Sequence, residues 1–186
     1  MRKLTHAEIV NRQARKSQTQ RLPLCVVLNH IRSLHNVGSI FRTADGVGVE
    51  KLWLCGATGY PPQGGISKTA LGAENHVPWE YRIEVLPLVR KLKAQGYQIV
   101  LLEQMQGSVS HDEFVPKSPV CLVIGNEITG TSDELTSLCD AAIEIEMAGI
   151  KNSLNVAVAF GIAAYQIRFR LINHLSRAEV LSKIIL

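Results

Sequence analysis

"LVIGNEITGTS", residues 122–132, joins three apolar residues to a turn that holds two glycines, an asparagine and a glutamate. The apolar run predicts a buried strand, and the small hydroxyl residues after the turn are typical of a helix start. Gly125 and Gly130 have the spacing of a phosphate-binding loop. However, the lysine of such a loop is missing, and Glu127 would put a negative charge where phosphates bind. We therefore expect a neutral or cationic ligand at this turn.

The same turn has a second interpretation, which needs no ligand. In that case it is a tight strand-to-helix connection, capped by Thr131 with Glu134 as the capping-box partner. Both interpretations predict a strand before the turn and a helix after it.

Strand patterns alternate with helix patterns along the rest of the chain. The predicted strands are 24–28, 51–54, 98–102, 120–124 and 141–145. The predicted helices are 39–45, 86–94, 132–139 and 153–173. This alternation predicts an α/β domain with a mostly parallel sheet and helices on both faces, in which ligands bind at the carboxyl ends of the strands. Residues 59–80 lack periodicity, and we expect a long loop across the top of the sheet.

The 186 residues, 46% of them hydrophobic, suffice for one domain with a single core. The cysteines stand far apart and no histidine has metal-ligand spacing, so we expect no metal site and no disulfide framework. No apolar run reaches the roughly 18 residues of a membrane span, and the N-terminus lacks the apolar core of a secretion signal. We therefore expect a protein of the reducing cytoplasm, without membrane contact.

The formal net charge is +4, and the basic residues gather near the two ends of the chain. Thr5 and Glu8 have capping-box spacing, which predicts a short helix within a basic extension, residues 1–21. Its basic face comprises Arg12, Arg15 and Lys16. Such a face suits a polyanion such as RNA, although a solvated, frayed terminus is the alternative.

Two further turns carry polar residues that helix capping explains only in part. In the turn after the first strand, Arg32, Asn36 and Arg42 could converge at the strand end, and Gly38 permits close approach of another backbone. In the turn after the last strand, Asn152 or Ser153 could cap the next helix. Asn155, placed inside the first turn of that helix, has no structural explanation. No dinucleotide-binding glycine pattern occurs.

Taken in order, the three turns resemble the three motifs of the SpoU/TrmH family of RNA ribose 2′-O-methyltransferases, within the SPOUT class. The first motif is represented by Asn36, Gly38 and Arg42, and the second by Gly125, Glu127 and Gly130. The third is represented by Met147, Gly149, Ser153, Leu154, Asn155 and Val156. Glu146 departs from the pattern, since the family usually has proline there. The resemblance covers about residues 22–170, within a domain that we assign to 22–175, followed by a tail, 176–186.

The resemblance implies a deep C-terminal trefoil knot, which periodicity alone would have excluded. It also implies S-adenosylmethionine as cofactor, bound in a bent form by the knot loops. The residues expected to bind it are Leu102, Glu103, Gly125, Asn126, Ile145, Met147, Ser153 and Leu154. A homodimer is implied as well, and the surplus apolar surface of the last helix suits a subunit interface. A core helix in a monomer is the alternative.

The resemblance further implies roles for five catalytic residues. Arg42 matches the family's catalytic arginine, but a guanidinium with a pKa above about 12 is a poor base. We therefore expect it to grip the substrate phosphate and stabilise the developing alkoxide. Asn36, Ser153 and Asn155 would position substrate or arginine, and Glu127 would orient the cofactor loop or the nucleotide. His35 is an alternative base.

The implied function is methylation of a ribose 2′-hydroxyl in structured RNA, with tRNA favoured over rRNA. Arg32 and the basic N-terminal helix are the expected RNA surface. The alternative function is that of a non-enzymatic RNA-binding or assembly protein that keeps the fold without the chemistry.

Overall fold

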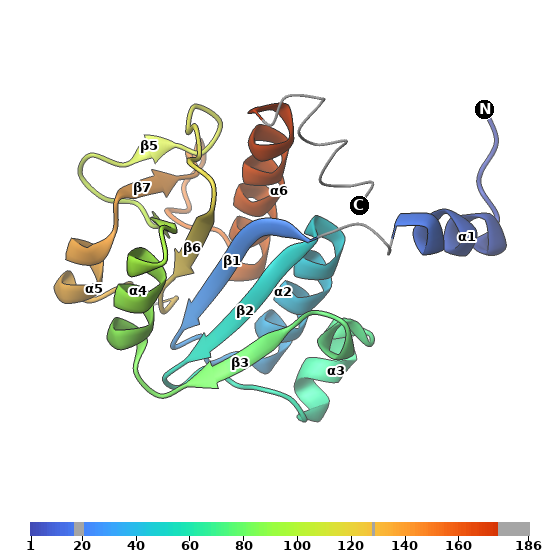
Figure 1. Cartoon of the computed structure of the whole chain (residues 1–186), viewed down its shortest axis with the longest axis horizontal. Helices are drawn as coiled ribbons and strands as arrows, with labels where there is room; N and C mark the ends of the chain where they lie inside the picture. Colours follow the sequence, from blue (N-terminus) through green and yellow to red (C-terminus); the bar gives the residue numbers. More distant parts are fainter. Residues whose placement is uncertain (17–20, 128, 175–186) are drawn as a thin grey trace.

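The computed structural model describes residues 1–16, 21–127 and 129–174, and Figure 1 shows how their helices and strands are arranged. In chain order the elements are α1 (His6–Lys16), β1 (Leu22–Asn29), α2 (Leu34–Val47), β2 (Val49–Cys55), α3 (Gly64–Ala70), the short 3₁₀ helix η1 (Ala73–Asn75), β3 (Trp79–Arg82), α4 (Val85–Ala94), β4 (Gln98–Leu102), β5 (Val109–Ser110), β6 (Val120–Ile124), α5 (Asp133–Leu138), β7 (Ala141–Glu144) and α6 (Val156–His174).

The strands form one sheet in the order β3-β2-β1-β6-β4-β7-β5, and every strand pair in it is parallel. Ile124 of β6 is paired with Leu28 of β1 on one side and with Leu102 of β4 on the other. The carboxyl ends of β1, β6 and β4 therefore meet at one edge of the sheet. This confirms the predicted α/β class.

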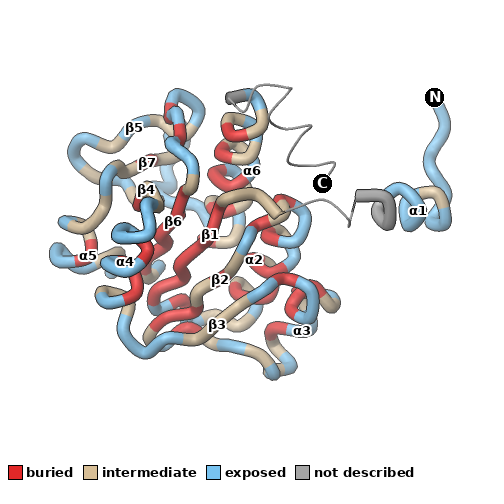
Figure 2. The backbone as a smooth tube through the Cα atoms, in the orientation of Figure 1, coloured by how far each residue is buried: buried red, intermediate tan, exposed pale blue. Residues whose placement is uncertain are grey.

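Both faces of the sheet are covered, which explains why its central strands are predominantly apolar. Alternate side chains point to opposite faces. Leu24 and Val26 of β1 belong to the core on the side of α2 and α6, whereas Cys25 and Val27 belong to the core on the side of α4 and α5. Figure 2 shows the resulting buried centre, with β1 and β6 buried along most of their length. The prediction of helices on both faces is confirmed.

All five predicted strands are present, and 98–102 and 120–124 have the predicted bounds. The long loop predicted over 59–80 is wrong, because this segment contains α3, η1 and the start of β3. Gly38 explains why α3 packs against α2: a Cβ there would lie 2.2 Å from the carbonyl oxygen of Ile66. The missing side chain lets the two helices meet, so the segment covers α2 rather than the top of the sheet. The two-residue strand β5 was also missed.

Several predicted helix boundaries are wrong because other residues make the caps. Helix α2 begins at Leu34, five residues before its predicted start, since the Ser33 hydroxyl accepts a hydrogen bond from the Asn36 N–H. It ends before Gly48, which adopts a left-handed φ of 79°. Arg42 is therefore in the third turn of α2, whereas the predicted start at residue 39 would put it only one turn into the helix.

The caps of α5 and α6 also differ from the prediction. Ser132, not Thr131, caps α5, and its hydroxyl accepts from the Leu135 N–H at 3.3 Å. Helix α6 begins at Val156, and the cap is Asn155 rather than Asn152 or Ser153. The side-chain oxygen of Asn155 accepts from the Ala157 N–H at 2.9 Å, which supplies the structural explanation that the sequence lacked.

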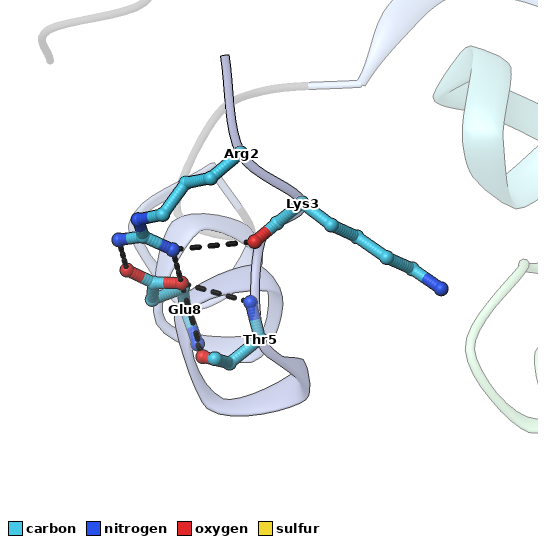
Figure 3. A network of polar contacts seen from close by, with 4 residues as sticks. All are labelled: Arg2, Lys3, Thr5 and Glu8. Carbon is cyan, nitrogen blue, oxygen red and sulfur yellow. Dashed lines mark hydrogen bonds and ion pairs between the residues drawn. The ribbon is translucent and has the colours of Figure 1, made fainter.

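The predicted helix near the N-terminus is present as α1, with the expected capping box. The Thr5 N–H donates to the Glu8 carboxylate at 2.8 Å, and the Glu8 N–H donates to the Thr5 hydroxyl at 3.3 Å. Figure 3 shows that Arg2 joins the same network. The predicted domain limits stay a prediction. So does the trefoil knot, since strand order and register do not define how the chain threads.

Candidate active site

Residues from the three turns meet in one chain of hydrogen bonds at the carboxyl edge of the sheet. The Asn155 amide donates to the Asn36 amide oxygen at 3.1 Å. The Asn36 amide nitrogen in turn donates to the Glu127 carboxylate at 3.2 Å. These residues lie far apart in sequence and belong to α2, the turn after β6 and the start of α6. The Asn36 amide is thus held from both sides in a single orientation.

The local structure explains why each side chain is available for this chain. Asn36 lies in the first turn of α2, where its backbone N–H is already bonded to Ser33. Asn155 uses its oxygen to cap α6, so its amide nitrogen is left to donate to Asn36. Glu127 projects from a turn closed by two backbone hydrogen bonds between Asn126 and Gly130, of 3.0 and 3.1 Å.

The tight turn after β6 depends on Gly125. A Cβ at this position would lie 2.6 Å from the Thr131 side chain and 2.9 Å from the backbone of Gly130. Any side chain would therefore force the turn open. The glycine spacing that suggested phosphate binding has a structural cause here, which is the close approach of the two ends of the turn.

A cavity of about 330 Å³ lies beside the hydrogen-bond chain, between the ends of β4, β6 and β7 and the start of α6. Its volume falls within the range of about 300–1,000 Å³ that is usual for small-molecule sites. All eight residues expected to bind a cofactor line it, and Glu127 lines it too. Six further lining residues were not among those expected to bind the cofactor, and these are Gln104, Ile124, Glu144, Asn152, Val156 and Ala159.

The cavity is acidic. Glu103, Glu127 and Glu144 line it, and no lysine or arginine of the described chain does. Glu144 is held in place by the Ser108 hydroxyl, at 2.6 Å from its carboxylate. A site with three carboxylates and no opposing cation favours a positively charged ligand. Glu144 was missed because one acidic residue at the end of a strand gives no signal of its own.

Arg42 stands apart from this site in the described chain. It is exposed, it does not line the cavity, and it makes no hydrogen bond or ion pair with any residue that the structure describes. On α2 it is six residues from Asn36, which corresponds to a rise of about 9 Å and a position about 120° around the helix axis. One copy of the chain therefore brings together Asn36, Glu127, Ser153 and Asn155, but not Arg42.

The residues of the expected RNA surface are not gathered at one place. Arg32 is exposed in the turn between β1 and α2, at the same edge as Asn36. Arg12 is exposed on α1, which Figure 1 shows outside the layers around the sheet. The side chains of Arg15 and Lys16 lie outside the described part of the chain. His35, the alternative base, is exposed next to Asn36.

Metal and thiol chemistry find no support in the described residues. They contain no group of three or more metal-ligating side chains that could hold an ion. Burial raises the pKa of the Cys55 thiol to about 12 and that of Cys139 to about 11, so neither is a ready nucleophile. None of the described helices is both long and apolar enough to cross a membrane.

The chain is similar in sequence to known proteins. The model of the SpoU rRNA Methylase family matches residues 23–165. A tRNA (guanosine(18)-2′-O)-methyltransferase of Aquifex aeolicus is 35% identical over 147 residues, which cover 77% of this chain and 67% of that protein. A TrmH family relative from Staphylococcus saprophyticus is 32% identical, and the match covers 87% of this chain and 64% of the relative. The chain thus spans about two thirds of the length of these relatives.

The fold is similar to that of solved structures as well. The structure of an A. aeolicus TrmH/SpoU tRNA modifying enzyme aligns with a TM-score of 0.78 and 30% identity, covering 94% of this chain and 92% of the other. An rRNA methyltransferase from Sinorhizobium meliloti, solved with AdoMet bound, aligns with a TM-score of 0.74 and 30% identity. That match covers 86% of this chain and 58% of the other.

Proposed function

The chain belongs to the SpoU rRNA methylase family, and we propose that it transfers a methyl group from S-adenosylmethionine to a ribose 2′-hydroxyl of structured RNA. The observation that carries this proposal is the hydrogen-bond chain from Asn155 through Asn36 to Glu127, beside an acidic cavity. Methyl transfer requires donor and acceptor to be held in line, and a side chain fixed from two sides is suited to that task.

The cavity fits S-adenosylmethionine in size and charge. When bound, this cofactor supplies a methyl group on a positively charged sulfonium, and it carries an ammonium and a carboxylate group besides, so its net charge is positive. Glu103, Glu127 and Glu144 give the cavity the opposite charge. Leu102, Ile145 and Leu154 offer apolar surface for a nucleoside, and the tight turn at Gly125 brings backbone groups to the cavity wall.

The polar residues around the cavity would position the ribose and handle its proton. Asn36 would orient the ribose, with its own orientation fixed by Glu127 and Asn155. Ser153, which is exposed and lines the cavity, would hold the substrate phosphate. Arg42 would stabilise the developing alkoxide, and the 2′-hydroxyl proton would leave to water or phosphate. Because Arg42 stands apart in its own chain, it would act on RNA held by a second copy.

We favour tRNA over rRNA as the substrate. The A. aeolicus tRNA methyltransferase is 35% identical to this chain. The solved A. aeolicus tRNA modifying enzyme aligns with a TM-score of 0.78, against 0.74 for the S. meliloti rRNA methyltransferase.

The test supplies methyl-labelled S-adenosylmethionine with unmodified total tRNA or, separately, rRNA, and identifies the labelled nucleoside after digestion. We expect a 2′-O-methylnucleoside, and we expect Arg42→Ala to lose it. Arg42→Lys should lower the turnover rate while RNA affinity is kept. Arg90→Ala, which removes an exposed arginine of α4, is the matched control and should keep full activity. A protein that binds the cofactor but methylates neither RNA pool would contradict the proposal.

We also propose that Arg32 and the basic N-terminal helix bind RNA phosphates. The logarithm of RNA affinity falls linearly with the logarithm of the salt concentration. Each phosphate contact that is lost makes this slope shallower by about one. Deletion of residues 1–20 should therefore weaken binding to all RNAs at low salt and reduce this slope. Affinities measured from about 50 to 200 mM salt test this, and an unchanged slope refutes it.

A further inference from the structure

His30 has a backbone conformation that needs an explanation. It follows the last residue of β1 and has a φ of 61°, in the left-handed region that favours glycine. Leu71, at the end of α3, is the other non-glycine residue with positive φ in the described chain. Residues held in such conformations gather at functional sites, where the surrounding structure maintains them.

Hydrogen bonds hold His30 on every side. Its N–H donates to the Cys55 carbonyl at 3.1 Å, and its carbonyl accepts from the Asn126 amide at 2.9 Å. The Ala57 N–H donates to ring atom Nδ1 at 3.1 Å. The ring lies over Gly56, where a Cβ would be 2.4 Å from ring atom Cε1.

These contacts fix the chemical form of the imidazole. Since Nδ1 accepts a hydrogen bond, the neutral ring carries its proton on Nε2. The residue is exposed, and no described residue accepts a hydrogen bond from Nε2. His30 therefore presents one oriented N–H donor to the solvent at the carboxyl edge of the sheet.

His30 lies beside the cavity, at the same edge of the sheet. The cavity lies at the ends of β4, β6 and β7, so a ligand inside it closes that side of the edge. The open side is formed by the turns after β1 and β2, which hold His30, Ala57 and the exposed Arg32. Asn126 contacts the His30 carbonyl and also lines the cavity, so the two sides are joined directly.

Given the proposed function, we propose that His30 is an RNA-positioning residue whose Nε2–H donates to a phosphate oxygen of the substrate strand beside the methylated nucleotide. A donor that is already fixed in direction loses little conformational freedom on binding. This gain in binding free energy would offset the conformational cost of the left-handed backbone.

The left-handed backbone allows a test in which folding and function are separated. His30→Gly removes the imidazole, and glycine tolerates the conformation, so the protein should still fold. We expect its KM for RNA to rise about tenfold, because one hydrogen bond to a charged group is lost. The KM for S-adenosylmethionine should be unchanged. Leu71→Gly is the matched control, an exposed residue of the same backbone class, and should leave both KM values unchanged.

A conservative replacement and a direct binding measurement complete the test. Gln has an amide nitrogen near the position of Nε2, so His30→Gln should regain part of the RNA affinity lost in His30→Asn. RNA affinity is also measured by filter binding without cofactor, where no turnover is needed. Wild-type affinity and wild-type KM for RNA in His30→Gly would overturn the inference, whatever the wild-type protein methylates. Absence of methyl transfer by the wild type would instead count against the proposed function.

Discussion

Gly38 shows how a single residue sets the spacing of two helices. A Cβ at this position would lie 2.2 Å from both the carbonyl oxygen of Ile66 and the hydroxyl of Thr69. Helix α3 is therefore in direct contact with the backbone of α2, near the turn that carries Asn36. In isolation, alanine is a better helix former than glycine by about 1 kcal/mol, so propensity and packing predict opposite effects of the same substitution.

We predict that Gly38→Ala lowers the free energy of unfolding by about 1–3 kcal/mol, since backbone atoms of α3 must move to admit the methyl group. Urea unfolding measures the change. The control is Gly64→Ala, at the first position of α3, where a Cβ would meet no heavy atom within 4 Å. It should change stability by no more than about 0.5 kcal/mol. Equal effects of the two substitutions would refute the packing argument.

At the same scale, the sequence indicated which residues matter but not how they interact. The motif spacing singled out Asn36, Glu127 and Asn155, and the structure joins these three by hydrogen bonds. That Asn155 both caps α6 and holds Asn36 depends on tertiary contact, which no local pattern encodes. Glu144 and His30 were missed for the same reason, because only the fold reveals what surrounds each of them.

At the level of elements, α1 is stabilised by a network of charges at its first turn (Figure 3). The Arg2 guanidinium, with the N–H and hydroxyl of Thr5, lowers the pKa of Glu8 from 4.5 to about 2. When α1 is frayed, the Glu8 carboxylate has its ordinary pKa and binds a proton more readily than it does in the capped helix. Protonation therefore favours fraying, and the stabilisation is present above about pH 4.5 and is lost as the pH falls through about 2.

We predict that the helical population of α1 falls as the pH is lowered from 6 to 3, with most of the loss below about 4.5. Carbon chemical shifts of residues 5–12 in the intact protein measure it, and core amide signals report whether the sheet stays folded. Glu8→Gln keeps the length of the side chain but has no charge to lose. Its α1 should be less helical at pH 6 and insensitive to pH, and a pH response equal to that of the wild type would contradict the assignment.

Elements were predicted best where burial dictates the pattern. β4 and β6 lie inside the sheet, so their runs are apolar except for Gln98 at the start of β4, and they are bounded by turn residues. α3 was missed because it begins with Gly64 and Gly65, which are poor helix formers, and β3 was missed because Glu80 and Arg82 interrupt its apolar pattern. Cap positions were wrong where two neighbouring residues can both cap, as at Thr131 and Ser132.

At the level of the whole molecule, α6 leaves an apolar stripe uncovered. The stripe comprises Val158, Ile162, Tyr165 and Phe169, each 36–58% exposed. These positions follow one another at intervals of three or four residues and so share one face of the helix. The stripe adjoins α2, since the Tyr165 hydroxyl is 2.9 Å from where a Cβ of Gly46 would be. Arg42 lies on α2 as well. We propose that a second copy of the chain covers the stripe.

We predict that the double substitution Val158→Glu and Phe169→Glu converts a dimer to a monomer, because two charges would be buried in an apolar interface. Sedimentation at several concentrations measures the change. Lys151→Glu is the control, since it adds the same charge at an exposed residue before α6 and should leave the dimer intact. A double variant with the mass of the wild type would refute this interface.

The dimer also gives a sharp test of where Arg42 acts. Arg42→Ala and Glu127→Ala should each be inactive alone. If Arg42 acts on RNA held by the partner, a mixed dimer has one site with both defects and one intact site, so an equal mixture regains about a quarter of the wild-type activity. If Arg42 acts within its own chain, every site of a mixed dimer lacks one of the two groups, and no activity returns. Coexpression of the two variants, followed by methyl-transfer assay of the whole mixture of dimers, distinguishes these outcomes.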